Sequence, residues 1–272
     1  MNILSNFDEK TATKEVLCVN HRASENHISE SMTFTTGNTE RELSVEHGMT
    51  IYVNEIPVYS VACSPTKLAE LAVGRIVSEG MVNPSDIDKV YLCDKGINAK
   101  IFLKENVKFE AGRSEISRVA TCCTDNKCLV SVEQEKKKLT HIIWKSEEIC
   151  RLAAAMEEKL PLYSATHAVH SAFLTHNGNI CYQAEDIGRH NALDKVIGMA
   201  VIDGMELSEC ILFSSGRVPV DMVSKAVTAG VAVFVGKGAP TAQAVNMAKE
   251  YGLTLICNAR KDSFNVYSDF LE

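Results

Sequence analysis

Residues 210–257 read CILFSSGRVPVDMVSKAVTAGVAVFVGKGAPTAQAVNMAKEYGLTLIC, and this stretch decides the fold. Three apolar runs in it, Ile211–Phe213, Val231–Val235 and Leu253–Cys257, lack the polar alternation of a strand with one face in water. The segments between these runs carry apolar residues at helical spacing. Buried strands that alternate with helices predict an α/β fold with a largely parallel sheet covered by helices.

The residues before this stretch extend the pattern. Ala172–Leu174 and Ile180–Gln183 flank Asn177-Gly178, a dipeptide typical of the turn in a β-hairpin. A helix with an apolar face from Leu193 to Ala200 is expected next. We therefore expect residues 165–272 to form an α/β core.

A smaller β-rich portion is expected over residues 43–164. Apolar and polar residues alternate from Met49 to Val58 around Asn54-Glu55, which predicts a β-hairpin. Ser64-Pro65 then opens a helix, and Gly80 ends it.

Two segments of the N-terminal half are expected to be less regular. Residues 1–42 are mixed and polar, which predicts a partly ordered lead-in. Residues from about 104 to 138 are polar and rich in charge, and we expect an irregular, mobile region there. After it, Ser146 is expected to cap a helix that stops at Pro161.

The composition disfavours several classes of protein. The chain has 272 residues and a formal net charge of −7, so no global positive field attracts nucleic acid or an anionic membrane. No apolar run reaches the ~20 residues that a membrane span needs, and the polar stretch Met1 to Lys14 lacks the apolar core of a signal peptide. We therefore expect a cytoplasmic protein without a structural set of disulfides, in which most of the seven cysteines that stand alone are small buried apolar residues.

Three loops of the expected α/β core each follow a strand and open a helix. They are Ala184–Asn191, Ser214–Arg217 and Gly236–Thr241. Such loops leave a parallel sheet at one edge, where the ligands of open α/β sheets bind. Each presents free N–H groups at a helix N-terminus, which favour anions. Together the loops predict a site for a phosphorylated ligand such as a nucleotide, with three basic residues to pair with phosphate: Arg189, Arg217 and Lys237.

Each of these residues also has a structural interpretation. Glu185-Asp186 can cap a helix, Arg189 and Lys195 can lie on a solvated face, and Asp194 can pair with either of them. The convergence of the loops on one edge favours a site over these interpretations. The chain has no phosphate-loop lysine motif and no GxGxxG fingerprint, which disfavours nucleotide hydrolases and nicotinamide enzymes.

A cluster of cysteines lies in the polar segment, at Cys122, Cys123 and Cys128. Zinc binding is disfavoured because no second cysteine pair accompanies the cluster, and His167 and His170 lack further ligands at zinc spacing. The thiols can be incidental, or one of them can be a nucleophile whose pKa a neighbouring basic residue lowers. A polar loop suits a thiol that must meet two partners in turn, so we favour a reactive cysteine.

Several motifs together resemble one protein family. Residues 185–195 read EDIGRHNALDK, which resembles the signature of the formate dehydrogenase accessory sulfurtransferases. The likeness extends from about residue 49 to 268 and covers most of the chain. The other matching motifs follow in the family's order: Pro65–Leu68, Ser78–Gly80, Ser214–Arg217, Ala239–Thr241 and Phe264–Tyr267.

The resemblance implies a fold similar to that of cytidine deaminases, an α/β/α core. It implies a sulfurtransferase that receives persulfide sulfur from a cysteine desulfurase and passes it to the molybdenum bis(guanine dinucleotide) cofactor, which formate dehydrogenase requires. The cofactor is then a bound client, no metal is held permanently, and a homodimer is expected. By the same resemblance Cys122 is the catalytic persulfide cysteine, with Cys123 as its rival.

The loops and the resemblance together define the residues expected to bind the cofactor. His170 matches the histidine of the family's TGGxHxA-like segment, and the segment around Arg260 and Phe264–Tyr267 matches the region that contacts the guanine dinucleotide. The full expected set is His170, Glu185, Asp186, Arg189, His190, Asn191, Asp194, Lys195, Ser215, Gly216, Arg217, Lys237, Gly238, Ala239, Pro240, Thr241, Arg260, Phe264, Asn265, Val266 and Tyr267.

The chain departs from the family pattern in two places. Asp125 stands where the second cysteine of a CxxC pair would follow Cys122, so a resolving role for Cys123 or Cys128 stays open. His167-Ala168 replaces a glycine pair, which alters the expected backbone there.

Two other functions compete with sulfur transfer. A non-catalytic chaperone that holds the cofactor for formate dehydrogenase would need the same binding motifs. A zinc deaminase, suggested by the likeness of fold, would need His-x-Glu and Pro-Cys-x-x-Cys, and the sequence has neither pattern. Sulfur transfer is therefore the preferred hypothesis.

Overall fold

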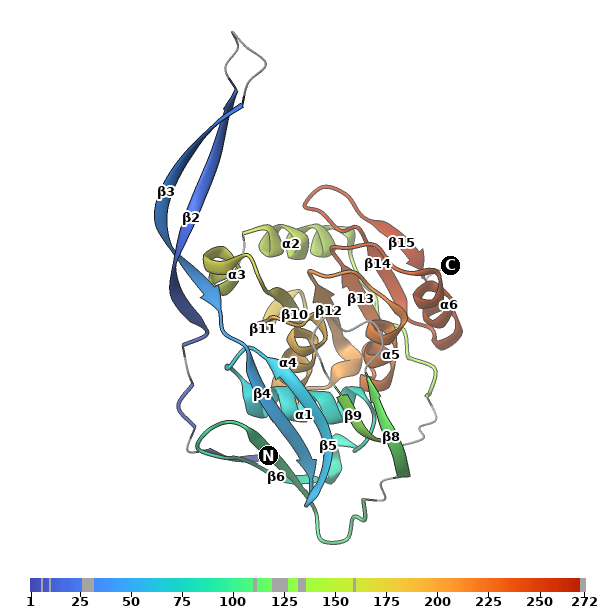
Figure 1. The fold of residues 1–272 in the computed structure, drawn as a ribbon. Helices are drawn as coiled ribbons and strands as arrows, with labels where there is room; N and C mark the ends of the chain where they lie inside the picture. Colours follow the sequence, from blue (N-terminus) through green and yellow to red (C-terminus); the bar gives the residue numbers. More distant parts are fainter. Residues whose placement is uncertain are drawn as a thin grey trace.

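The structure is a computed structural model and describes residues 1–5, 7–9, 11–25, 32–109, 112–118, 127–131, 136–158 and 160–269. In residues 21–25, 32–36, 112–118 and 127–131 it describes the backbone alone. Within these ranges the chain forms two large sheets with helices between them, and a two-stranded hairpin that projects from the body (Figure 1).

The C-terminal half is built on a six-stranded sheet in the order β11-β10-β12-β13-β14-β15. The alternation of strands and helices confirms the α/β class. The expectation of a largely parallel sheet is wrong, because parallel pairing in this sheet is confined to β12, β13 and β14, and the sheet is mixed. The reason is that the β10–β11 hairpin and the returning strand β15 add antiparallel pairs at its two sides. The strands are β10 (His170–His176), β11 (Asn179–Asp186), β12 (Cys210–Ser214), β13 (Val233–Gly236), β14 (Thr254–Cys257) and β15 (Asn265–Ser268).

Helices cover both faces of this sheet. One face carries α4 (Arg189–Ile202), α5 (Val220–Ala229) and α6 (Ala242–Tyr251). The other face packs its apolar side chains against α2 (Ser146–Glu157), which buries Ile149 and Leu152. Helix α2 ends at Glu157, before Pro161 as expected, but its N-cap residue is Lys145 and Ser146 is its first residue, so the expected cap at Ser146 is wrong. Pro161 begins a further short helix, α3 (Pro161–Thr166), because its fixed φ suits a first helical position.

The N-terminal half is a seven-stranded sheet in the order β1-β6-β7-β4-β5-β9-β8, and α1 (Leu68–Ser78) packs against it. The expected hairpin is present as β4–β5, with Asn54 of its turn at φ 52°. Short 3₁₀ turns lie at Pro84–Asp86 and Leu207–Glu209. The strands are β1 (Asn2–Ser5), β4 (His47–Val53), β5 (Ile56–Cys63), β6 (Ile87–Leu92), β7 (Asn98–Leu103), β8 (Gly112–Arg118) and β9 (Lys127–Ser131).

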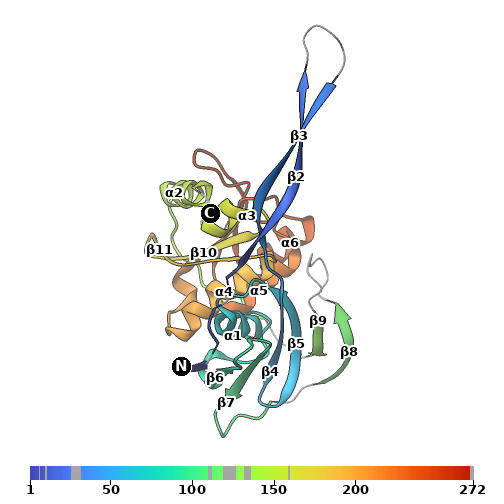
Figure 2. The same ribbon diagram turned by 60° about the vertical axis from the view of Figure 1, so that its left-hand side comes forward.

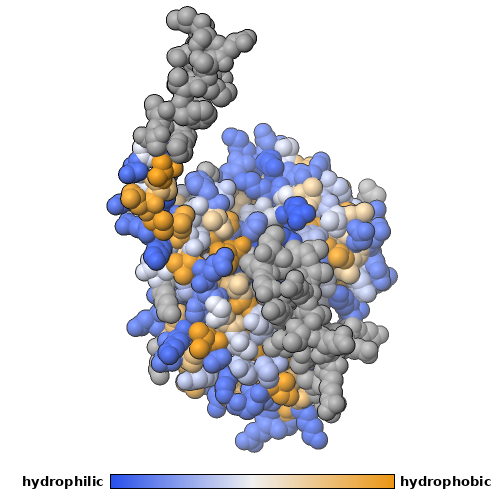
Figure 3. All heavy atoms as spheres, viewed as in Figure 1, coloured by the Kyte–Doolittle hydropathy of each residue, from blue (hydrophilic) through white to orange (hydrophobic). Residues whose placement is uncertain are grey.

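Two segments that we expected to be irregular contain strands. The region from 104 to 138 holds β8 and β9. Residues 1–42, expected as a partly ordered lead-in, contain β1 and most of the hairpin of β2 (Thr13–Glu25) and β3 (Met32–Ser44). This hairpin extends away from the rest of the molecule (Figure 2). Its described part carries exposed apolar side chains, among them Leu17 and Val19, 66% and 58% exposed (Figure 3).

The two halves meet where α1 crosses α4, and two glycines allow the helices to approach closely. A Cβ on Gly74 of α1 would lie 1.8 Å from the carbonyl oxygen of Asp194, and one on Gly198 of α4 would lie 1.9 Å from that of Glu70. The molecule is thus layered as sheet, α1, α4 with α5, sheet and α2 (Figure 1). Within the described ranges, no helix combines the length and hydrophobicity that a bilayer crossing needs.

Candidate functional site

The expected loops meet at one edge of the C-terminal sheet. Strand β11 runs antiparallel to β10, and β10 runs antiparallel to β12, so β11 points the same way as β12, β13 and β14. The C-terminal ends of these four strands and the first residue of β10, His170, therefore lie at the same edge. We call this the loop edge.

Hydrogen bonds from backbone N–H groups join the loops to one another. The N–H of Ser171 donates to Oγ of Ser215 at 2.9 Å, and the N–H of Ser215 donates to the carbonyl of Ser171 at 2.9 Å. The N–H of Lys237 donates to the carbonyl of Ser214, also at 2.9 Å. A Cβ on Gly238 would lie 2.6 Å from the carbonyl oxygen of Gly216, so the close approach of these loops requires glycine.

His170 and Arg189 lie together over Gly216. A Cβ on this glycine would lie 3.0 Å from Cδ of Arg189 and 3.5 Å from Nδ1 of His170. Burial, and next the positive charge of Arg189, lower the pKa of His170 below its ordinary value of 6.5. A neutral imidazole and a guanidinium are therefore adjacent at neutral pH, and such a pair can donate hydrogen bonds to an anion.

Three helices begin at the loop edge. The N-cap residues of α4, α5 and α6 are Gly188, Pro219 and Thr241, and the Thr241 hydroxyl accepts from the N–H of Ala244 at 3.3 Å. Nε2 of His190 lies 2.9 Å from Oδ2 of Asp221, which joins the first turns of α4 and α5. The edge therefore directs several helix N-termini to one region, an arrangement that favours a phosphate-bearing ligand.

A pocket of about 460 Å³ opens on the α2–α3 side of this edge. His170, Ser171, Ser215 and Lys237 bring polar groups to it. The rings of Tyr163 and His167, in contact edge to face with centroids 5.3 Å apart, add aromatic surface. Of the described lining residues, only His170, Ser215 and Lys237 were expected from the sequence; Met156, Tyr163, His167, Ala168, Val169 and Ser171 were not. Recognising Pro161 as a helix start would have indicated Tyr163.

Two residues shape the α3 wall of the pocket. The carboxylate of Glu185 accepts from the N–H groups of Leu162 at 2.9 Å and Tyr163 at 2.7 Å, so it caps α3 rather than pointing at a ligand. Burial raises the pKa of Glu185, although these hydrogen bonds act to lower it. His167 ends α3 with φ 54°, a left-handed conformation that a glycine would adopt without strain.

Other residues of the 185–195 run are enclosed in the interior. Asp186 is fully buried, and its Oδ2 lies 2.6 Å from Nζ of Lys195 and accepts from the N–H of Ser64 at 3.0 Å. Its Oδ1 accepts from Gly188 and from Nδ2 of Asn191. These bonds tie the start of α4 to the end of β5.

Asp194 occupies a second buried cluster, between α1, α4 and α5. Its carboxylate lies 2.8 Å from Nε of Arg75 and 3.0 Å from Nζ of Lys225, and it accepts from the Ser78 hydroxyl at 2.6 Å. Lys225 also lies 2.6 Å from the carboxylate of Glu79.

Asp194 and Lys195 therefore contact protein groups, and neither lines the pocket. The expected solvated face for Lys195 is wrong, because this side chain is fully buried against Asp186. The expected pairing of Asp194 with Lys195 or Arg189 is also wrong, because Asp194 points toward α1 and α5 and meets Arg75 and Lys225.

Comparisons with known proteins show which family the chain belongs to. Residues 44–271 match the model of the FdhD/NarQ family. The chain belongs to that family. It is 34% identical over 242 residues to the sulfur carrier protein FdhD of Listeria innocua, with 85% of this chain and 91% of that protein covered. It is 31% identical to the sulfur carrier protein FdhD of Bacillus pumilus, with 84% and 88% covered.

A solved structure shares the fold of this FdhD/NarQ chain. It is a putative formate dehydrogenase accessory protein from Desulfotalea psychrophila, with a TM-score of 0.69 and 20% identity, covering 93% of this chain and 96% of that one. At this identity the likeness concerns the fold alone. The family resemblance read from the motifs is thus confirmed.

The remaining expected residues of this FdhD/NarQ chain lie in or beside the loops. Arg217, Ala239 and Arg260 are exposed, and Nη1 of Arg260 donates to the carbonyl of Lys237 at 2.7 Å. Pro240 pairs with Val218 in a parallel bridge. The segment Phe264–Tyr267 leads through β15; Phe264 packs edge to face on Trp144, the Tyr267 hydroxyl accepts from Asn258 at 3.0 Å, and Asn265 and Val266 are exposed.

The expected catalytic cysteines, Cys122 and Cys123, lie outside the described residues. The strands on either side of them are described: Arg118 pairs with Lys127, and Lys127 pairs with Ser60 of β5. Strand β5 ends at Cys63, and the N–H of the next residue, Ser64, donates to Asp186 at the end of β11, so β5 connects β9 with the loop edge. Among the described residues, no group of three or more His, Cys, Asp or Glu could hold a metal ion.

Proposed function

We propose that this protein is a sulfur carrier that moves persulfide sulfur from a cysteine desulfurase to the molybdenum bis(guanine dinucleotide) cofactor, for the maturation of formate dehydrogenase. The relatives named sulfur carrier protein FdhD support the general role. The observation that carries the binding part of the proposal is the meeting of three helix N-termini with His170, Arg189 and Lys237 at one edge.

The loop edge suits the chemistry of the client cofactor. Its phosphates can accept from backbone N–H groups at the starts of the helices and from the guanidinium of Arg189. Tyr163 and His167 offer aromatic faces beside these donors, which suits the stacking of a guanine ring. Arg217 and Lys237 add positive charge where the chain as a whole is acidic.

The sulfur-carrying step is assigned to Cys122 or Cys123. Burial raises the pKa of three other cysteines, Cys63, Cys210 and Cys257, to about 12, so these are thiols at neutral pH. A thiolate is the reactive form, and thus none of the three is suited to attack a persulfide.

Sulfur moves in two exchanges under this proposal. The thiolate of Cys122 attacks the outer sulfur of the desulfurase persulfide, a new S–S bond forms, and the desulfurase cysteine leaves as a thiolate. In the second exchange the S–S bond on Cys122 breaks and the outer sulfur becomes a ligand of the client's molybdenum. The client metal supplies the two electrons that reduce this sulfur, and Cys122 returns as a thiolate.

Intact-protein mass measurement after incubation with a desulfurase and cysteine tests the carrier role. We expect the wild-type chain to gain a sulfur atom that a thiol reductant removes. Cys122→Ser together with Cys123→Ser should abolish the gain, whereas Cys181→Ser, which removes an exposed thiol elsewhere, should leave it unchanged. Undiminished sulfur on the double variant would reject the assignment.

A second candidate is a chaperone that holds the cofactor without transferring sulfur. It is favoured by the fact that the described loop edge is assembled without a reactive cysteine. Complementation of a strain that lacks the accessory protein separates the two functions. If the Cys122→Ser, Cys123→Ser variant restores formate dehydrogenase activity, the chaperone is correct and the carrier is wrong.

The proposal also concerns the location, the oligomeric state and the fold family of the protein. We propose that it acts in the cytoplasm as a homodimer, because a persulfide carrier requires reduced thiols and the family resemblance implies a dimer. We also propose that the α/β half is similar to cytidine deaminases. Its support is a mixed sheet with helices on both faces. Size-exclusion chromatography with light scattering tests the dimer.

A further inference from the structure

A second pocket lies where three consecutive lysines meet the end of α5. It encloses about 490 Å³ and is lined by Lys136, Lys137 and Lys138 of the segment that joins β9 to α2, and by Thr228 and Gly230 at the end of α5. We call it the lysine pocket. The proposed sulfur transfer makes no use of it.

The charges of this pocket have one sign. Among the described residues that line it, every charged side chain is a lysine, although the whole chain carries a net charge of −7. A pocket of about 650 Å³ beside α2 is a useful contrast, since Lys145 and Arg151 there are accompanied by Glu147, Glu148 and Glu209. Positive and negative side chains offset each other in that pocket, whereas the lysine pocket favours an anion.

The lysines differ in how they are held. Lys136 is half-buried and donates to the Ser224 hydroxyl; burial lowers the pKa of this lysine, while the carboxylates of Glu79 and Glu250 act to raise it. Lys137 and Lys138 are exposed, and their side chains make no ion pair or hydrogen bond among the described residues. Their two ammonium groups are therefore available to a ligand.

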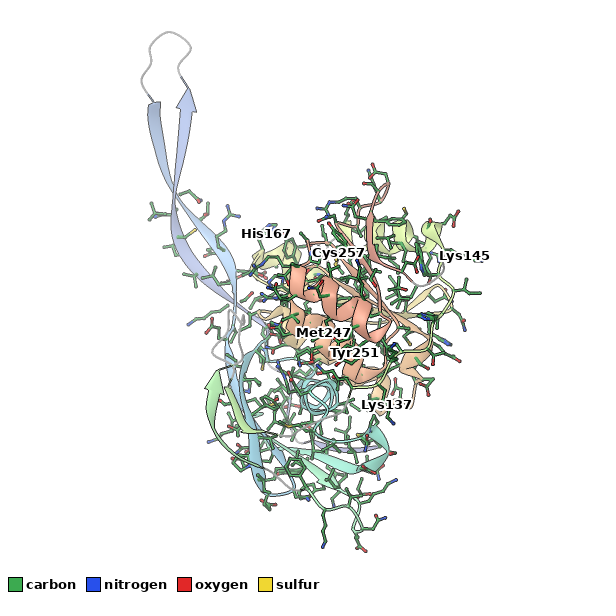
Figure 4. The ribbon with its side chains drawn as sticks, turned by 90° about the vertical axis from the view of Figure 1, so that its right-hand side faces the viewer. Lys137, Lys145, His167, Met247, Tyr251 and Cys257 are labelled. Atoms are coloured by element: carbon green, nitrogen blue, oxygen red, sulfur yellow. The ribbon has the colours of Figure 1, made fainter. Side chains whose placement is uncertain are left out.

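The lysine pocket is separate from the loop edge. Helix α5 begins at the loop edge and ends at Ala229, beside the pocket, so its ten residues separate the two regions by about 15 Å. Figure 4 agrees: Lys137 lies near Tyr251 at the end of α6, well away from His167. The N–H of Leu139 donates to the carbonyl of Tyr251 at 2.9 Å, which fixes the lysine segment there.

We propose that the lysine pocket binds the phosphate groups of a small molecule. Lysine ammonium groups bind phosphate as point charges, and the hydroxyls of Thr140, Ser208 and Thr228 can donate further hydrogen bonds. The volume lies within the range of small-ligand sites. Val227 supplies an apolar wall for the part of the ligand without charge.

A structural role for these lysines predicts different behaviour. The C-terminal end of α5 carries partial negative charge, and lysines near a helix end can neutralise it. If that were their whole role, removing two of them would lower the stability of the protein without changing its affinity for phosphates.

The test is calorimetric titration of the full chain with inorganic tripolyphosphate, comparing two double variants. Lys137→Gln with Lys138→Gln removes charge from the pocket, and Lys95→Gln with Lys104→Gln removes the same charge from exposed positions of the N-terminal half. We expect the first pair to weaken binding by about tenfold or more, because each lysine lost removes a charged hydrogen bond. The second pair should leave binding unchanged.

A further arm separates the lysine pocket from the loop edge. The pocket variants are repeated in a chain that already carries Arg189→Gln and Arg217→Gln, and the lysine-dependent binding should persist there. Loss of the lysine-dependent binding in that background would overturn the proposal. Equal weakening of tripolyphosphate binding by the two lysine double variants would also overturn it. So would a lower Tm of the Lys137→Gln, Lys138→Gln variant with unchanged affinity. Lys138→Gln alone is the fallback if the double variant does not fold, because this exposed side chain makes no hydrogen bond or ion pair with a described neighbour.

Discussion

The loop edge and the α1–α4 interface both contain polar side chains, and the two regions use them differently. At the interface, Asp186 and Asp194 are fully buried and already paired with Lys195, Arg75 and Lys225. At the loop edge, His170 and Lys237 remain half-buried beside an open pocket. Polar side chains of the first kind hold the fold together, and those of the second kind are available to a ligand.

The difference follows from position along α4. Arg189 and His190 lie in its first turn, where N–H groups face the loop edge, whereas Asp194 lies more than one turn further along, against α1. A single motif therefore fixes the packing of the two halves and positions the site. Substitutions in the two regions should consequently separate stability from binding.

The largest effect is expected from Asp194→Ala, which leaves Arg75 and Lys225 without this buried partner. Breaking a buried ion pair by removing one member costs about 3–5 kcal/mol in the free energy of unfolding. Urea denaturation measures the loss. The control, Asp94→Ala in the exposed turn between β6 and β7, should change stability little. Equal losses in both variants would contradict the distinction between interior and surface charges.

Gly74→Ala should come next. The added Cβ would lie 1.8 Å from the carbonyl oxygen of Asp194, a backbone atom, so α1 and α4 must separate to admit it. Overpacking of this kind costs about 1–3 kcal/mol or more. Gly48→Ala is the matched control, because a Cβ there meets nothing within 4 Å. Thermal unfolding should show a lower Tm for Gly74→Ala alone; an unchanged Tm would mean that the close crossing does not contribute to stability.

A binding effect is expected at the other region. Arg189→Gln removes the guanidinium beside His170 and should weaken binding of guanosine diphosphate by about tenfold, as loss of a charged hydrogen bond would. Arg151→Gln, which removes the same charge on α2 away from the edge, should not. Isothermal titration measures both. Equal affinities for the two variants would remove the phosphate-binding role from this arginine.

The contrast also explains what the sequence could predict. The strands and helices of residues 210–257 were recognisable because buried strands and amphipathic helices leave local patterns. The meeting of the three strand-to-helix loops at one edge could also be predicted, because loops that follow parallel strands leave the sheet at the same edge. The role of Asp194 could not be read, because an aspartate looks the same whether it meets a ligand or Arg75, a partner more than one hundred residues earlier in the chain.

The projecting hairpin was missed for a different reason. Its described side chains face water on both sides, so β2 and β3 lack the alternation that marks a half-buried strand. Leu17 lies across from Glu40 and Val19 across from Asn38, and polar and apolar residues are thus mixed on one face. Backbone pairing between β2 and β3, rather than burial of one face, therefore forms these strands.

The smallest expected effect is a dependence of stability on pH that arises at the loop edge. The pKa of His170 in the folded chain is below 6.5, because burial and then Arg189 disfavour its charged form. The unfolded chain therefore binds the proton more readily, and stability rises with pH in this range. The contribution of His170 is fully present above pH 6.5 and is lost as the pH falls through the unfolded and then the folded pKa.

Thermal unfolding of wild type and His170→Asn between pH 8 and 5 measures this contribution, with those limits set about 1.5 units either side of the ordinary histidine value. The difference in Tm between the two should shrink as the pH falls, because the wild type alone must bury a charged imidazole beside Arg189. His176→Asn is the control, since His176 lies by Glu209 at the opposite end of β10. A constant difference between wild type and His170→Asn would mean that neither burial nor the charge of Arg189 lowers the pKa of His170 in the folded chain.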